Sequence, residues 1–201
     1  FDPSAEVYSL VWETDALKNL GHCLVKTVSK VVAVQAAKFW LVAMSTIAAA
    51  VLGALMLPMA VLAFSGAIDN SWTIVHARAK KVGKLLAETL VERVQGNRPV
   101  SLFGVSLGAQ VVYSCLKHLL VLKSQGQNVL GILENVFVVG GACPSDAEKW
   151  SLFSPLIAGR LVNVYCKSDW ILGIVHRTAG KTSKAAGLDE INSRWVENID
   201  V

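Results

Sequence analysis

The chain has 201 residues, a length that favours a single domain with one hydrophobic core. Hydrophobic residues make up 53% of it, charged residues only 17%, and the mean hydropathy of +0.49 exceeds that of an ordinary soluble domain. Lys and Arg outnumber Asp and Glu by only 19 to 15 and are scattered, which argues against nucleic-acid binding. The four cysteines form no C-x-x-C pair and no histidine lies at metal-ligand spacing, so we expect reduced thiols, no metal and no cofactor.

The chain opens with a strand-like run that is followed by a long amphipathic pattern. Residues 6–12 are rich in β-branched and aromatic side chains, which predicts a buried strand. After Thr14, a suitable N-cap, apolar residues recur over 17–32 at the spacing of one helix face. The chain begins at Phe1 without Met and ends at Val201 directly after a strand-like run, so we expect a domain that is incomplete at both ends.

A hydrophobic helical insert is predicted over about residues 31–68. Its 30 residues from 39 to 68 carry no charge, more than the roughly 20 that span a bilayer as a helix. Gly53 and Pro58 divide it into two arms. Basic residues precede and follow it, namely Lys26, Lys30, Lys38, Arg78, Lys80, Lys81 and Lys84. This charge pattern favours a re-entrant or interfacial hairpin on the cytoplasmic face of an intracellular membrane. The alternative is a helix pair buried within the protein or against a partner, and a single transmembrane crossing is the least favoured topology.

The remainder of the chain alternates between helical and strand-like segments. Residues 69–71 can cap a helix whose apolar stripe continues to Val94. A helical pattern also covers 107–123, and strands are predicted at 100–105, 132–139, 161–166 and 196–201. Such alternation predicts an α/β fold with three layers, in which a mostly parallel sheet has helices on both faces.

A G-x-S-x-G motif lies where the first of these strands meets its helix. It runs from Gly104 through Ser106 and Leu107 to Gly108. In a nucleophile elbow the serine is held in a strained turn, and residues two before and two after it must lack bulk. The turn directs the Ser106 hydroxyl away from the sheet, and the N–H of Leu107 can face a developing oxyanion. The alternative is a glycine-rich turn that serves only packing.

Asp169 occupies the position expected for the acid of a catalytic triad, shortly after a later strand. Its neighbours Trp170, Ile171 and Leu172 are expected to shield it from water. The alternative, compatible role is an N-cap for the helix that begins near Trp170.

No histidine occupies the expected position of the catalytic base, which is a loop after the last strand. His22, His76 and His118 are predicted to be structural, and His176, on the same short helix that follows Asp169, is a weak candidate. We therefore expect the base to follow Val201, outside these 201 residues.

Several motifs resemble the eukaryotic transmembrane and coiled-coil domain-containing hydrolase-like family, also called domain of unknown function family 726. They comprise GVSLGA at 104–109, GILENV at 131–136, GRLVNVYCKSDW at 159–170 and VENID at 196–200. The resemblance extends from end to end. One departure is the pair Gly140-Gly141 before Ala142 and Cys143, where the family tends to have one glycine before Ala-Pro.

What this resemblance implies is an α/β-hydrolase fold, membrane association through the insert and a lipase or esterase activity. Ser106 would be the nucleophile and Asp169 the acid, and the second oxyanion donor would precede Phe1. We thus expect a membrane-associated serine ester hydrolase that acts on a membrane lipid or other acyl ester. The alternative is an inactive hydrolase-fold scaffold that binds membrane and trafficking partners. Transport is disfavoured because the insert lacks polar relay residues.

Overall fold

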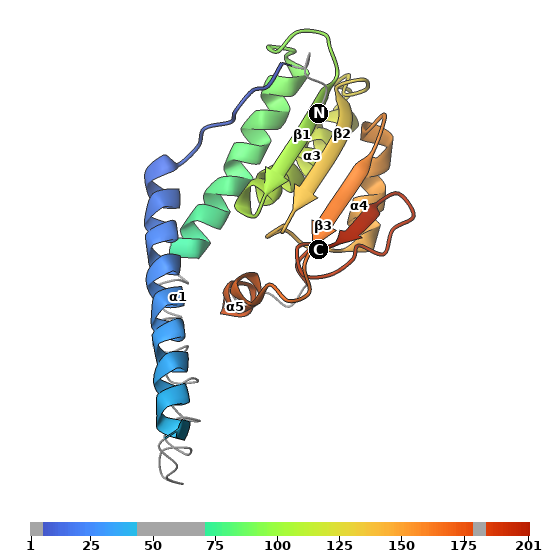
Figure 1. Ribbon diagram of the computed structural model, residues 1–201. Helices are drawn as coiled ribbons and strands as arrows, with labels where there is room; N and C mark the ends of the chain where they lie inside the picture. The colour runs from blue at the N-terminus through green and yellow to red at the C-terminus, as the bar shows by residue number, and fades with distance from the viewer. Residues whose placement is uncertain (1–5, 44–70, 179–183) are drawn as a thin grey trace.

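The computed structural model describes residues 6–43, 71–178 and 184–201 (Figure 1). Helix α1, Thr14–Ala43, begins at the predicted N-cap and contains the start of the predicted insert. The rest of that insert lies outside the described residues. Across the three described ranges, no helix combines the length and the apolar composition needed to cross a bilayer.

The prediction of a buried strand over residues 6–12 is wrong. This segment forms no regular element, and its side chains are open to solvent, with Val7 78% and Val11 81% exposed. The reason is that a strand needs a neighbour to pair its backbone groups. Within the part of the chain that the structure describes, no strand lies beside this segment.

Four parallel strands form the sheet, in the spatial order β1-β2-β3-β4. Their bounds are Val100–Val105 for β1, Leu133–Val139 for β2, Leu161–Tyr165 for β3 and Glu197–Asp200 for β4. The four strands predicted from residue 100 onward are confirmed, with bounds that differ by at most one residue. Because all four run the same way, their carboxyl ends meet at one edge of the sheet.

Helices cover one face of this sheet, namely α3 at Leu107–Ser124 and α4 at Ala147–Phe153 with a 3-10 turn at Ser154–Leu156. A helix over residues 71–91 packs on α3 through Gly83, and α5 at Trp170–Thr178 lies beyond the carboxyl edge of the strands (Figure 1). In Figure 1, α3 and α4 lie behind the strands. Successive right-handed crossovers that advance in one direction place their helices on the same side of a sheet, and the strand order here advances in only one direction.

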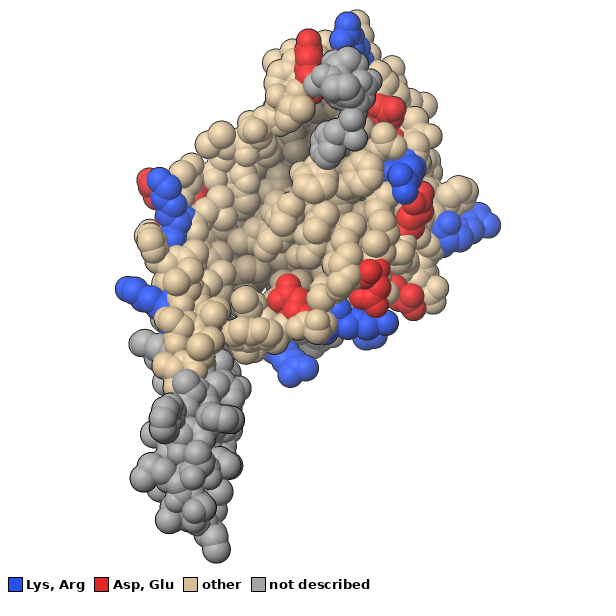
Figure 2. Space-filling view, viewed as in Figure 1, with Lys and Arg blue, Asp and Glu red and all other residues tan. Residues whose placement is uncertain are grey.

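The third layer that the sequence predicts is not present among the described residues. The face of the sheet opposite α3 exposes Phe103 by 58%, Val105 by 53% and Ile199 by 43%. Figure 2 shows this face as an uncharged surface with charged side chains at its margins. Helices could cover it only through connections that run in the opposite direction across the sheet.

A main core lies between the sheet and its helices. Its centre is an aromatic group in which Tyr113 of α3 contacts Trp150 and Phe153 of α4, with ring centroids 5.5 Å apart in both pairs. Burial raises the pKa of the Tyr113 hydroxyl to about 12. A second cluster joins the beginnings of α1, the 71–91 helix and α3 to α5 through Leu20, Trp72, Leu107 and Leu172.

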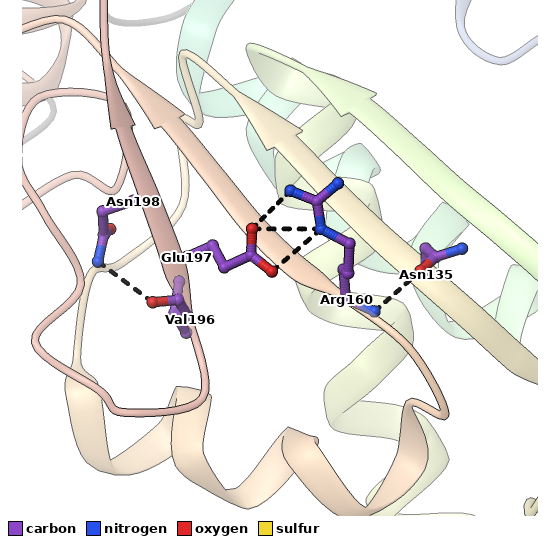
Figure 3. Close-up of polar contacts among 5 residues, drawn as sticks. All are labelled: Asn135, Arg160, Val196, Glu197 and Asn198. Carbon is purple, nitrogen blue, oxygen red and sulfur yellow. Dashed lines mark hydrogen bonds and ion pairs between the residues drawn. The ribbon is translucent and has the colours of Figure 1, made fainter. Parts of the chain in front are cut away.

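The outermost strand is held by polar contacts at its beginning (Figure 3). Arg160 makes a bidentate ion pair with Glu197, with nitrogen–oxygen distances of 3.0 and 2.6 Å. The Arg160 N–H donates to Oδ1 of Asn135 at 2.8 Å, which ties the same loop to β2. These contacts fix the order of β2, β3 and β4 at the edge where the chain enters them.

At the other edge, β1 passes very close to the first turn of α3. A Cβ added to Gly104 would lie 2.7 Å from the carbonyl oxygen of Gly108 and 2.8 Å from the nitrogen of Ala109. A Cβ added to Gly108 would meet nothing within 4 Å. The prediction that both glycines of the motif must lack bulk is therefore confirmed for Gly104 and wrong for Gly108 in the described part of the fold.

This asymmetry predicts opposite effects of two alanine substitutions. Gly104→Ala should lower the free energy of unfolding by about 1–3 kcal/mol or more, because backbone atoms must move. Gly108→Ala should leave it unchanged or raise it by up to about 1 kcal/mol, since alanine favours a helix over glycine. Thermal unfolding of the two full-length variants, followed by tryptophan fluorescence, measures the difference. Equal effects of both substitutions would contradict the packing described.

Candidate active site

Ser106 joins β1 to α3 in a backbone conformation that residues with a side chain rarely adopt. Its φ is 51° and its ψ is −113°, and it is the N-cap of α3 without making a side-chain capping bond. The residue is exposed. A non-glycine residue in such a region stores strain on the order of 1–3 kcal/mol, which the surrounding structure must offset.

Main-chain hydrogen bonds hold this strained residue. The Ser106 N–H donates to the carbonyl of Val139 at the end of β2, at 2.9 Å. Its own carbonyl accepts from the N–H groups of Ala109 at 3.2 Å and Ala142 at 3.1 Å. The backbone of Ser106 is thus fixed from both β2 and α3.

Leu107 is the first residue of α3, where backbone N–H groups have no partner within the helix. Its side chain is buried in the second cluster. The N–H thus lies at the positive end of the helix dipole and directly follows the exposed serine. This arrangement can bind a negatively charged oxygen.

Asp169 follows β3 at the same edge of the sheet and is half-buried. Its Oδ1 accepts from the N–H of Leu172 at 2.9 Å, and its carbonyl accepts from Gly173 at 3.0 Å. The predicted N-cap of α5 is therefore confirmed. A carboxylate has about four acceptor positions, so capping leaves capacity for a second donor.

The expected shielding of Asp169 is only partly present. Leu172 is buried, but Trp170 is 46% exposed and Ile171 is 36% exposed. These two side chains lie on the outer side of α5, because the inner side of the helix packs on the second cluster. Water therefore reaches this end of the helix.

The sheet order sets the separation of the two strands that precede the candidate residues. Ser106 follows β1 and Asp169 follows β3, with only β2 between these strands. Neighbouring strands lie about 4.8 Å apart, which places the two strand ends about 10 Å apart along the edge.

Two loops cross each other after the end of β2. The N–H of Gly187 donates to the carbonyl of Gly141 at 2.9 Å, and Ala186 donates to Cys143 at 2.8 Å. A Cβ at Gly187 would lie 2.3 Å from the carbonyl carbon of Gly140, so the backbones touch. It is therefore Gly187 that must lack a side chain at this crossing, whereas Gly140 has a φ of 53° and open space around its Cα.

Three of the four histidines lie on helices other than the one that Asp169 caps. His76 Nε2 is 3.0 Å from Gln110 Oε1, and His118 Nε2 is 3.0 Å from a carboxylate oxygen of Glu88. His22 is exposed on α1. His176 is buried on α5, seven residues beyond the cap and hence about 10 Å along the helix axis. This distance argues against His176 as the partner of Asp169.

Three side-chain amides with structural roles were not singled out from the sequence, those of Gln110, Asn163 and Asn198. Gln110 links His76 to Ser114, whose Oγ accepts from Gln110 Nε2 at 2.8 Å. Asn163 of β3 donates to Asn198 Oδ1 of β4 at 3.2 Å. Asn198 also accepts from the N–H of Ile191 at 2.9 Å, which fixes the loop that leads into β4. A polar residue within an otherwise apolar strand or helix face was the available signal.

The structure offers no metal site in the parts of the chain that it describes, where no group of three His, Cys, Asp or Glu residues could hold an ion. All four cysteines are free. Burial raises the pKa of the Cys115 thiol to about 12, so this thiol is unreactive at neutral pH.

This chain is similar to parts of several much longer proteins. It is 37% identical over 196 residues to the transmembrane and coiled-coil domain-containing protein STS1 of Oryza sativa, with 98% of this chain and 29% of that protein covered. It is 33% identical over 199 residues to the uncharacterized membrane protein F35D11.3 of Caenorhabditis elegans, covering 98% and 31%. It is 33% identical over 202 residues to the probable lipase MIL1 of Saccharomyces cerevisiae, covering 99% and 18%.

The chain thus spans less than a third of the length of these three curated relatives. No solved structure matches it. The model of the family described as proteins of unknown function (DUF726) matches residues 1–201, so the chain belongs to that family.

Proposed function

We propose that this chain is the core of a membrane-associated serine ester hydrolase of the α/β-hydrolase type, with Ser106 as its nucleophile. The observation that carries the proposal is the strained, exposed serine at the carboxyl end of a parallel strand and the start of a helix. Strain of this kind persists where function requires it. The name of the yeast relative, probable lipase, supports the same class of activity.

The proposed reaction has two steps. The Ser106 Oγ attacks the carbonyl carbon of an ester while a histidine takes its proton, and the tetrahedral oxyanion is bound by the Leu107 N–H. Collapse of this intermediate returns the proton to the leaving alcohol and leaves an acyl-serine. Water then hydrolyses the acyl group by the same sequence and regenerates the hydroxyl.

Asp169 is proposed to orient that histidine, which comes from sequence beyond Val201 or from elsewhere in the full-length protein. Asp169 follows the second strand along from Ser106, a separation that accommodates an imidazole. The loop contacts of Asn198 hold β4 firmly, so a segment that follows β4 starts from a fixed point at the same edge.

We propose that the substrate is an acyl ester in a membrane lipid. The uncharged stretch of residues 39–68 is proposed to enter the same bilayer. Relatives in rice, worm and fission yeast carry the word membrane or transmembrane in their names. The basic residues on both sides of the stretch favour a cytoplasmic site on an intracellular membrane.

The nucleophile is tested with a fluorophosphonate probe on the full-length protein. Ser106→Ala should abolish covalent labelling, because the probe reacts only with an activated serine. The matched control is Ser101→Ala, an exposed serine on the same strand, which should label as the unmodified protein does. Labelling that survives in Ser106→Ala would place the nucleophile elsewhere.

Two substitutions separate the roles of Asp169. Asp169→Asn keeps an oxygen that can cap α5 but removes the charge, so stability should be kept while the hydrolysis rate falls on the order of 10⁴-fold. Asp169→Ala should lose the same activity and also about 1 kcal/mol of stability. Ester hydrolysis and thermal unfolding of both variants provide the measurement. An active Asp169→Asn enzyme would show that the residue is only a cap.

The inactive scaffold is the second candidate, favoured by the confirmed capping role of Asp169. A scaffold would show no labelling of Ser106 in the unmodified protein and no activity to lose on Asp169→Asn. It would still bind membranes through the uncharged stretch. The labelling experiment on the unmodified protein therefore decides between the two candidates.

A further inference from the structure

Helix α5 is apolar on its outer side as well as on the side that packs against the domain. Leu172 and Val175 are buried, at 6% and 2% exposure, within the second cluster. Trp170 and Ile171, which open the helix directly after Asp169, are 46% and 36% exposed. Large apolar side chains that are exposed together mark an interaction surface.

The position of α5 relates this surface to the proposed membrane segment. The second cluster places its inner side against Leu20 of α1 and Trp72 of the 71–91 helix. In Figure 1, α1 runs in the same direction as the strands and continues past their carboxyl edge, where α5 lies. The uncharged residues 39–68 begin within the far part of α1. Helix α5 therefore lies on the side of the domain from which that stretch leaves.

The surroundings of this surface have the character of a lipid interface. Lys167 lies before Trp170 with a side chain 63% exposed and its Nζ 3.9 Å from Oδ2 of Asp200, and the exposed Arg177 lies in the last turn of α5. Tryptophan is enriched at the level of lipid headgroups, and flanking cations bind anionic lipids. On α1, Val25 is 68% exposed and Val32 is 58% exposed, and a separation of seven residues places both on one helix face.

We propose that the outer side of α5, centred on Trp170 and Ile171, inserts into the headgroup region of an anionic bilayer, the same bilayer that residues 39–68 enter. This rests on the proposed membrane association. It deepens that proposal by assigning a contact beside the candidate site. The insertion would hold the edge with Ser106 and Asp169 at the depth of lipid ester groups, so that an acyl ester reaches the serine without leaving the membrane.

The test uses the full-length protein reconstituted into vesicles of phosphatidylcholine with a minority of phosphatidylglycerol. The partly exposed Cys23 and Cys166 are first replaced by serine, while the buried Cys115 and Cys143 are kept. A nitrobenzoxadiazole label is attached to Trp170→Cys and, separately, to Ile171→Cys. The matched control is Leu152→Cys on α4, an apolar helix residue that is 60% exposed. Lipids that carry a nitroxide near the headgroup serve as quenchers.

The expected result is a blue-shifted emission at both α5 positions that nitroxide lipids quench, and a polar, unquenched emission at Leu152→Cys. Polar and unquenched emission at positions 170 and 171 would overturn the proposal. Blue-shifted emission that lipids do not quench would also overturn it, because another part of a protein would then cover the helix.

Failure here is distinguishable from failure of the proposed function. The quenching is read without substrate and should persist in a Ser106→Ala background, so it is independent of hydrolysis. Flotation of the vesicles with the protein reports membrane association separately. Protein that floats while positions 170 and 171 remain unquenched would reject only the role of α5.

Discussion

The backbone of Ser106 depends on the end of β2 more than on any side chain. The carbonyl of Val139 and the N–H of Ala142 hold it from one side, and α3 begins on the other. A turn with this φ and ψ cannot persist on its own, because the strain on the order of 1–3 kcal/mol must be offset by bonds that relaxation would break. The pairing of β1 with β2 therefore fixes the backbone of Ser106, and the loop after β2 belongs to the candidate site.

The same loop also connects the chain segments that meet at the carboxyl edge of the sheet. Residues 140–143 touch the backbone of Gly187, and this crossing ties the end of β2 to the segment between α5 and β4. The capped start of α5, the crossing and the elbow thus form one connected structure made mainly of main-chain bonds. Rigid elements position reacting groups better than mobile loops do. An arrangement held by the backbone also tolerates variation in the side chains above it.

Much of this fold could be predicted from the sequence because its elements are long and strongly periodic. The strands at 100–105, 132–139 and 161–166 are apolar runs flanked by turns, and they agree with β1, β2 and β3 within one residue. The segment at 6–12 has the same composition, but no strand lies beside it in the described residues, and composition cannot reveal this.

The predicted third layer is absent from the described residues for a related reason. Alternation predicts parallel strands, but the direction of successive crossovers decides which face the helices cover. Of the site, Gly104 and the cap at Asp169 follow from local rules, while the Asn163–Asn198 contact joins residues 35 positions apart.

The uncovered face and the unpaired segment have one physical explanation. Phe103 and Val105 lie on a face that a soluble domain does not leave open, and Val7 and Val11 lie in a run suited to a strand but without one beside it. Strand order here advances from β1 in one direction only. Helices on the open face would require strands on the free side of β1, because only crossovers to that side run the other way. Relatives more than three times as long have ample chain for both.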